Sequence, residues 1–143
     1  MDELRRPRGT RDHTPEEMSE RRGLEKVIME VARKFGFDEV RTPIFEHTEL
    51  FEAKSGEDIV AQLYAFEDKS ERSLTLRPEL TAPVMRMVAT SSLRERPRPV
   101  KVFYSGPCFR YEEAKTGRWR EFDQFGVEVI GASGSLVEAE VMA

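Results

Sequence analysis

Two extended segments joined by a charged loop, within residues 102–130, constrain the fold of this chain more than any other feature. Along the second segment, alternate side chains point to opposite faces of a strand. One face carries Phe125, Val127 and Val129, which suit a core. The opposite face combines aromatic, amide, glycine, carboxylate and aliphatic residues, namely Phe122, Gln124, Gly126, Glu128 and Ile130. A half-buried strand ordinarily has one apolar and one solvated face, so this pattern predicts a hairpin whose second face is partly covered.

Gln124 and Glu128 lie on that second face, so their side chains point the same way. Polar pairs of this kind usually face solvent. Because Phe122, Gly126 and Ile130 flank this pair, however, we expect it to be partly buried. A covered amide and carboxylate need a partner with donors and acceptors in matching places, which indicates a binding pocket.

A long helix is predicted upstream, with Thr14 as N-cap, Pro15 in the first position and Glu17 completing a capping box. Gly36 is a candidate C-cap. Apolar residues repeat at helical spacing in this segment, at Leu24, Val27, Ile28, Val31 and Phe35. The stripe is compatible with packing on the chain's own sheet, on a second subunit, or on both.

The rest of the chain alternates between extended and helical patterns. We expect a strand interrupted at Pro43, a short helix within 48–54, a hairpin of Leu63–Glu67 with Arg72–Leu76, a helix capped by Thr81, and a final helix from about Ser135. The predicted fold is α/β of the α+β type, with an antiparallel sheet of about five or six strands flanked by helices.

Composition excludes several classes of protein. The chain has 143 residues and a formal net charge of −4, which favours one soluble domain and restricts any RNA contact to a local surface. It has neither a membrane-spanning apolar run nor the apolar core of a signal peptide. A single cysteine, Cys108, fits a reducing cytoplasm. His13 and His47 are far from it in sequence, so we expect no metal site.

Three residues of the predicted hairpin have side chains that suit the binding of a nucleotide. Arg110 and Arg118 would direct guanidinium groups toward one polyanion, which suits phosphate, while Phe122 would provide an aromatic platform for a base. The alternative is an exposed ion pair and a solvated loop. Glu79 follows a strand and precedes a helix, so it either binds a ligand or favours the helix dipole.

The segments RGTRDHTPEE, VRTPIFE, LTLRPELTAPVMR and VFYSGPCFRYEEAKTGRWREFDQFGVEVIG occur in the order and spacing of histidyl-tRNA synthetases. The chain resembles this family of class II aminoacyl-tRNA synthetases over nearly its whole length. Residues from about 18 to 46 resemble motif 1, and residues from about 102 to 130 resemble motif 2. The resemblance implies an incomplete class II catalytic core spanning residues 1–143.

The resemblance also implies an ATP site. Arg110 matches the catalytic motif 2 arginine that holds the α-phosphate of ATP. Glu112 matches the contact to the adenine amino group, and Phe122 matches the residue that stacks on the ring. Arg118 matches the loop arginine that reaches the β- and γ-phosphates. Mg²⁺ is expected to accompany ATP, without a dedicated protein site.

A histidine site is implied in the same way. Glu79 and Thr81 match residues that hold the α-amino group of L-histidine, whereas Gln124 and Glu128 match residues that line the amino-acid pocket. The implied activity is ATP-dependent formation of histidyl-adenylate and transfer to tRNA(His). The implied assembly is a cytoplasmic homodimer formed through motif 1, without membrane contact.

The sequence departs from the family pattern in several places. No segment resembles motif 3, the second histidine-specific stretch or the anticodon-binding domain, so we expect the amino-terminal part of a catalytic domain with half of the site. Leu80 stands where many relatives have glycine. The main alternative is the non-catalytic paralogue that regulates ATP phosphoribosyltransferase, which has no chemical need for the motif 2 residues. A dimerisation module is a third possibility, but it leaves Gln124 and Glu128 unexplained.

Overall fold

The computed structural model describes residues 5–53, 57–113 and 117–142. Its elements, in chain order, are α1 (Pro15–Lys34), β1 (Asp38–Glu39), β2 (Phe45–His47), α2 (Glu49–Glu52), α3 (Glu57–Val60), β3 (Tyr64–Glu67), β4 (Ser73–Leu76), α4 (Thr81–Thr90), the 3₁₀ turn η1 (Ser92–Glu95), β5 (Val100–Phe109), β6 (Glu121–Ile130) and α5 (Ser135–Met142). The predicted interrupted strand, both hairpins and the four predicted helices are therefore confirmed. Within the described ranges, no helix is both long enough and apolar enough to cross a bilayer.

The strands form two three-stranded sheets, in the orders β1-β5-β6 and β2-β4-β3. The antiparallel prediction is right for β5 with β6 and for the whole second sheet. It is wrong for β1, which runs parallel to β5 with Asp38 opposite Val102. A parallel pair needs a long crossover connection, and the second sheet and α4 lie within that connection.

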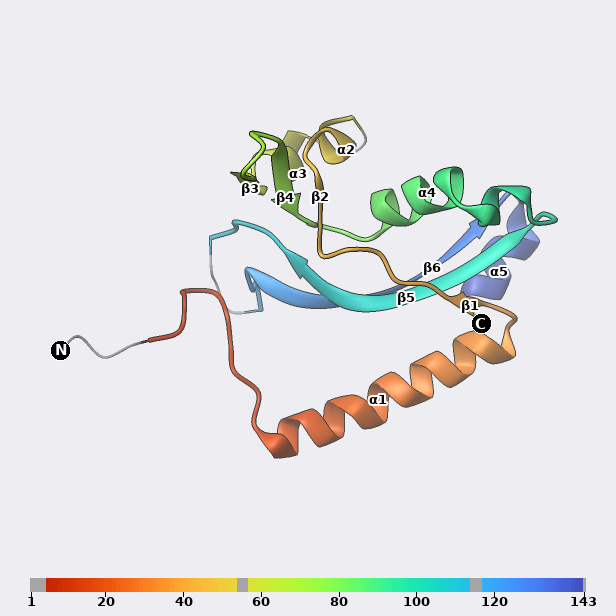
Figure 1. Cartoon of the computed structure of the whole chain (residues 1–143). Coiled ribbons are helices and arrows are strands. Elements are labelled where there is room, and N and C mark those ends of the chain that lie inside the picture. The colour runs from red at the N-terminus through yellow and green to blue at the C-terminus, as the bar shows by residue number, and fades with distance from the viewer. Residues whose placement is uncertain (1–4, 54–56, 114–116, 143) are drawn as a thin grey trace.

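Helices cover the two faces of the β5–β6 hairpin (Figure 1). On one face, Leu80 and Val84 at the start of α4 pack with Val102 and Tyr104 of β5, and Phe122 and Ile130 of β6 join this cluster. On the other face, Ala32 of α1 packs with Phe37 and Phe103, and Val127 and Val129 join them. The alternation predicted for β6 is confirmed, because its two residue sets contribute to different cores.

The ends of α1 are fixed by local hydrogen bonds. Thr14 and Glu17 form the predicted capping box, in which each side chain accepts from the other's backbone N–H, at 3.3 and 2.9 Å. At the other end the C-cap is Phe35, one residue before the position predicted. Gly36 follows with φ of +78°, and the N–H of Phe37 donates to the carbonyl of Ala32 at 3.1 Å. Glycine suits this left-handed position, since it has no Cβ to clash.

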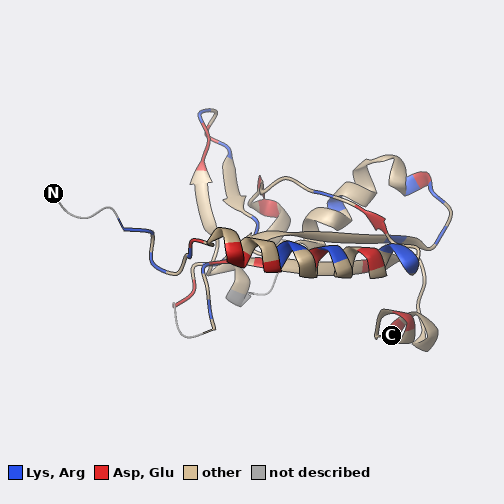
Figure 2. Ribbon diagram, turned by 90° about the horizontal axis from the view of Figure 1, so that it is seen from below, with Lys and Arg blue, Asp and Glu red and all other residues tan. Residues whose placement is uncertain are grey.

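The apolar stripe of α1 is largely uncovered within the described chain. Leu24 is 62% exposed and Val27 58% exposed, whereas Met29 and Ala32 contact the sheet side. Figure 2 shows α1 lying across the β5–β6 hairpin with acidic and basic residues interspersed along it. The residues that made the helix recognisable in sequence therefore form an outer surface in this chain.

A buried arginine that the sequence reasoning did not single out connects the two sheets. Arg77, 2% exposed, donates from Nε to the carbonyl of Pro107 at 2.9 Å and from Nη1 to the carbonyls of Thr42 and Pro43 at 2.9 and 3.1 Å. Burial lowers the pKa of this guanidinium below its ordinary value. A Cβ on Gly106 would lie 2.5 Å from Nη2 of Arg77, so the glycine leaves room for the arginine beside β5.

Candidate functional site

Three of the four predicted histidine-binding residues, Glu79, Thr81 and Glu128, lie where the start of α4 covers the centre of the β5–β6 hairpin. Tyr104 lies opposite Gly126 in this hairpin. The Tyr104 hydroxyl donates to Oε1 of Glu128 at 3.0 Å and lies 3.3 Å from Oγ1 of Thr81. Thr81 and Glu128, from different elements, are thereby connected through one tyrosine, which the sequence reasoning had not assigned to the site.

Glu79 caps α4 with its carboxylate. Oε2 accepts from the N–H of Thr81 at 2.7 Å and Oε1 accepts from the N–H of Ala82 at 2.9 Å. The expectation that Thr81 is the N-cap is wrong, because Leu80 holds that position and makes no side-chain cap bond. Thr81 is instead the first helical residue, and its hydroxyl bonds Tyr104. The positive end of a helix favours a carboxylate at this place.

Tyr104 fits because the residue opposite has no side chain. A Cβ on Gly126 would lie 2.5 Å from Cε2, Cζ and the hydroxyl oxygen of Tyr104. The tyrosine is 3% exposed, and burial, more than its neighbouring groups, raises the pKa of its hydroxyl to about 12. At neutral pH the hydroxyl therefore keeps its proton and acts as a donor.

Gln124 lies on the same face, nearer the loop that joins β5 to β6. Its Oε1 accepts from Sγ of Cys108 at 3.4 Å. The thiol is fully buried, and burial raises its pKa to about 11, so Cys108 is a protonated donor at neutral pH rather than a reactive thiolate. The bond fixes the amide oxygen and leaves the amide N–H groups of Gln124 for another acceptor.

The predicted ATP residues begin directly beyond Gln124. Arg110 donates from Nε to the carbonyl of Pro78 at 2.9 Å, and its guanidinium carbon lies 5.2 Å from the ring centroid of Phe122. Both side chains are half-buried. A cation over an aromatic face at this distance is favourable, so the predicted phosphate ligand and the predicted base platform are neighbours.

Glu112 and Arg118 form a looser pair near the tip of the hairpin. Oε2 of Glu112 lies 3.6 Å from Nη1 of Arg118, which is 71% exposed. Residues 114–116 of the predicted motif 2 lie outside the described part of the chain. Arg120 is held differently, because its Nε donates to the carbonyl of Glu112 at 3.0 Å and its guanidinium lies over Tyr111. A long ion pair with one highly exposed partner contributes little stability, so Arg118 can leave Glu112 at small cost.

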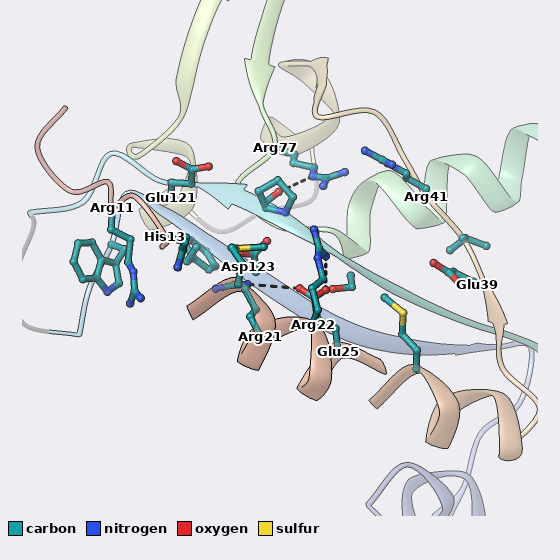
Figure 3. A pocket seen from close by; sticks show the side chains of 18 residues that line it. Arg11, His13, Arg21, Arg22, Glu25, Glu39, Arg41, Arg77, Glu121 and Asp123 are labelled. Atoms are coloured by element: carbon teal, nitrogen blue, oxygen red, sulfur yellow. Dashed lines mark hydrogen bonds and ion pairs between the residues drawn. The ribbon is translucent and has the colours of Figure 1, made fainter. Parts of the chain in front are cut away.

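A cavity of about 660 Å³ lies on the other face of the hairpin, between α1 and the sheet. Figure 3 shows arginines and carboxylates around it, and Arg21 pairs with Asp123 and Arg22 with Glu25. Of the eight predicted site residues only Phe122 lines it. We take the α4 face as the candidate functional site, because Thr81, Glu128 and the Arg110–Phe122 pair lie there.

Comparisons with known proteins agree with this architecture. A family model described as histidyl-tRNA synthetase matches residues 9–143. The chain is 53% identical over 139 residues to a histidine–tRNA ligase of Archaeoglobus fulgidus, and 54% identical over 140 residues to one of Methanosarcina acetivorans. These alignments cover 97% and 98% of the chain but 34% of each relative. The chain thus spans about a third of the length of the curated relatives that it matches.

Solved structures show the same fold. The apo histidyl-tRNA synthetase of S. aureus matches with a TM-score of 0.82 and 41% identity, covering 97% of this chain and 32% of that one. A Bacillus halodurans structure, described as an ATP phosphoribosyltransferase regulatory subunit/histidyl-tRNA synthetase, matches with a TM-score of 0.86 and 30% identity, covering 99% of this chain and 36% of that one. The fold is that of class II aminoacyl-tRNA synthetase catalytic domains. The chain belongs to the histidyl-tRNA synthetase family.

Proposed function

We propose that the protein carrying this chain is a histidine–tRNA ligase, which uses ATP to convert L-histidine to histidyl-adenylate and transfers the histidyl group to tRNA(His). One observation carries the proposal: the Arg110–Phe122 pair lies beside the group formed by Glu79, Thr81 and Glu128 on one face of the β5–β6 hairpin. A phosphate ligand with a base platform next to a polar amino-acid pocket suits a reaction between ATP and an amino acid.

In the activation step, a carboxylate oxygen of histidine attacks the α-phosphorus of ATP and pyrophosphate leaves. Arg110 stabilises the negative charge that builds on the α-phosphate. Phe122 stacks on the adenine, Glu112 accepts from its amino group, and Arg118 leaves Glu112 to reach the β- and γ-phosphates. Mg²⁺ accompanies ATP, held largely by phosphate oxygens. No protein nucleophile is needed, so positioning carries the reaction.

The amino-acid pocket is supported by hydrogen-bonding capacity. The Glu79 carboxylate accepts two backbone N–H groups, and a carboxylate has about four acceptor positions. It can therefore also accept from an α-ammonium group, together with Thr81. Gln124 and Glu128 then face the imidazole, which needs both a donor and an acceptor.

Assembly into a cytoplasmic homodimer is part of the proposal. We assign motif 1 to the α1–β2 segment and motif 2 to the β5–β6 hairpin. Leu24, Val27 and Val31 form an exposed apolar stripe on α1, and a second copy would cover it in a self-complementary twofold contact. The site on the α4 face stays open to tRNA(His) in such a dimer.

A regulatory, non-catalytic function is the second candidate. The observation that favours it is the match to the Bacillus halodurans structure, which is described as an ATP phosphoribosyltransferase regulatory subunit/histidyl-tRNA synthetase and has a TM-score of 0.86. Such a protein would bind histidine without forming an adenylate. The retained pair of Arg110 and Phe122 favours the ligase, because histidine binding alone requires neither a phosphate ligand nor a base platform.

The two candidates differ in histidine-dependent exchange of pyrophosphate into ATP. The complete gene product that contains residues 1–143 is expected to catalyse this exchange, and Arg110→Ala is expected to lower it at least about 100-fold, the usual cost of losing a charge-stabilising donor. The exposed Arg94 of η1 provides the control, Arg94→Ala. Histidine binding without exchange would favour the regulatory candidate. If the protein neither binds histidine nor catalyses the exchange, both candidates are excluded.

A further inference from the structure

We propose that Tyr104 is a positioning residue that couples recognition of the α-ammonium group of histidine to recognition of its imidazole. The inference rests on the proposed histidine site and adds a residue that the site assignment does not include. Tyr104 lies beneath the pocket, within hydrogen-bonding distance of Thr81 and Glu128, which are proposed to bind opposite ends of the amino acid.

The direction of the hydrogen bonds follows from proton counting. A tyrosine hydroxyl has one proton to donate, whereas an ionised carboxylate only accepts. Tyr104 therefore donates to Oε1 of Glu128, at 3.0 Å. The contact to Thr81, at 3.3 Å, then requires the threonine hydroxyl to donate to the tyrosine oxygen. The result is a directed chain from Thr81 through Tyr104 to Glu128.

This direction determines what Thr81 offers a ligand. With its proton engaged by Tyr104, Oγ1 presents only lone pairs to the pocket. An α-ammonium group has three donors and no acceptor, so it matches an oxygen that can only accept. Without Tyr104, the threonine hydroxyl would rotate and lose this preference. Thr81 is exposed in the described chain, which leaves Oγ1 accessible to a ligand.

At the other end, the same hydroxyl fixes Glu128. One carboxylate oxygen is engaged by Tyr104, so the other is oriented toward the pocket to accept from an imidazole N–H. The orientation of Glu128, which is proposed to bind the imidazole, thus depends on the same hydroxyl that orients Thr81, which is proposed to bind the α-ammonium group. Hydrogen bonds in series polarise one another in a low-dielectric site, which provides the coupling.

The tyrosine ring is held rigidly enough for this role. It is packed with Leu80, Val84 and Val102 in the core beneath α4, and the missing Cβ of Gly126 allows the ring to lie across β6. Burial also keeps the hydroxyl protonated, with a pKa of about 12. A phenylalanine would retain the ring and its packing but not the hydroxyl.

Tyr104→Phe in the complete gene product tests the inference. We expect the KM for histidine in pyrophosphate exchange to rise at least about 10-fold, as for a lost hydrogen bond to a charged group, while the KM for ATP stays within twofold. Tyr64→Phe in β3 is the matched control and is expected to change neither. A merely structural role would lower the melting temperature and disturb both substrates together.

A double-mutant cycle with Thr81→Val isolates the coupling. Because each change breaks the same chain, the combined rise in histidine KM should fall at least about threefold short of the product of the single effects. A second measurement needs no variant. With ring-labelled tyrosine, the Tyr104 ζ-carbon resonance should move on saturation with histidine, while that of Tyr64 should not.

The failures of the two proposals are distinguishable. Suppose that the wild type binds and activates histidine. The coupling role is then overturned, and the ligase proposal stands, if Tyr104→Phe leaves the histidine KM unchanged, if the effects of Tyr104→Phe and Thr81→Val on this KM multiply independently, or if the Tyr104 resonance does not move. If the wild type neither binds nor activates histidine, both are overturned.

Discussion

The guanidinium carbon of Arg110 lies 5.2 Å from the ring centroid of Phe122, and the same arginine donates to the carbonyl of Pro78 at 2.9 Å. Pro78 directly precedes Glu79, which caps α4. The arginine proposed to bind phosphate is therefore anchored to the segment proposed to bind the amino group of histidine, which fixes the distance between the two substrate sites.

ATP affinity is expected to depend on Arg110 more than on Arg118. Arg110→Ala removes the half-buried, anchored arginine that is proposed to bind phosphate, with an expected loss of about 1.5–3 kcal/mol of binding free energy. Arg118 is 71% exposed and must first be ordered, so Arg118→Ala should cost less. Calorimetric titration of both variants with ATP provides the comparison. An unchanged affinity in Arg110→Ala would refute the phosphate assignment.

Two glycine-to-alanine changes should alter stability in opposite directions. Gly126→Ala places a methyl group against the buried Tyr104 ring and should lower the free energy of unfolding by about 1–3 kcal/mol, as overpacking does. A Cβ on Gly23, in α1, meets nothing within 4 Å, so Gly23→Ala should raise the free energy of unfolding by about 0.5–1 kcal/mol. Urea unfolding measures both, and a Gly126→Ala protein as stable as wild type would contradict the close packing.

Alkaline pH should destabilise the fold through Cys108. Burial raises the thiol pKa from 9.0 to about 11, so the unfolded chain releases this proton at lower pH than the folded chain does. The resulting stabilisation is complete below about pH 9 and is lost as the pH rises through about 11. Urea unfolding of wild type and Cys108→Ala across this range should show a shallower decline for the variant. Parallel declines would refute the contribution of the thiol.

Arg77 should not be replaceable by lysine. Its planar guanidinium donates to three carbonyls in different segments, a pattern that a single ammonium cannot reproduce. Leaving one buried carbonyl unpaired costs about 1–3 kcal/mol, and Arg77→Lys should lose at least that amount in thermal or urea unfolding. Arg96→Lys, which alters an exposed pair with Asp38, is the control and should change stability by less than about 0.5 kcal/mol.

Association should depend on the outer face of α1. Leu24 is 62% exposed, so Leu24→Glu places a charge on the surface without disturbing the core. We expect sedimentation to show a concentration-dependent dimer for wild type and a weaker one for the variant, with stability rising with protein concentration for wild type. A monomer at all concentrations would contradict the proposed twofold contact.

Local features could be predicted from the sequence because their determinants are adjacent in the chain. The capping box of Thr14 and Glu17 needs only three residues of separation, and the alternation along β6 directly reports its two faces. The parallel pairing of β1 with β5 could not be predicted, since its register depends on segments distant in sequence. The apolar stripe of α1 identified a helix, but periodicity does not say what covers a face.

The site was predicted less completely than the fold. Gln124 and Glu128 stand out because they share a strand face with the apolar side chains of Phe122 and Ile130. Tyr104 lies in a core pattern and resembles any buried aromatic until its hydroxyl partners are placed. The structural role of Arg77 was not predicted for a similar reason. Arginine is rarely buried, and the carbonyls around this one are not evident from the sequence. Gly106 and Gly126 were available signals, as each is required beside one of these two side chains.

The alternation along β6 makes the length of this strand as important as its composition. Neighbouring residues contribute to different cores, and shifting a strand by one residue exchanges its faces. An insertion or deletion that shifts Gln124 and Glu128 by one residue in the β5–β6 register would therefore turn both side chains toward α1 and place valines in the proposed pocket. Within this strand, the spacing of the residues itself encodes the proposed binding site.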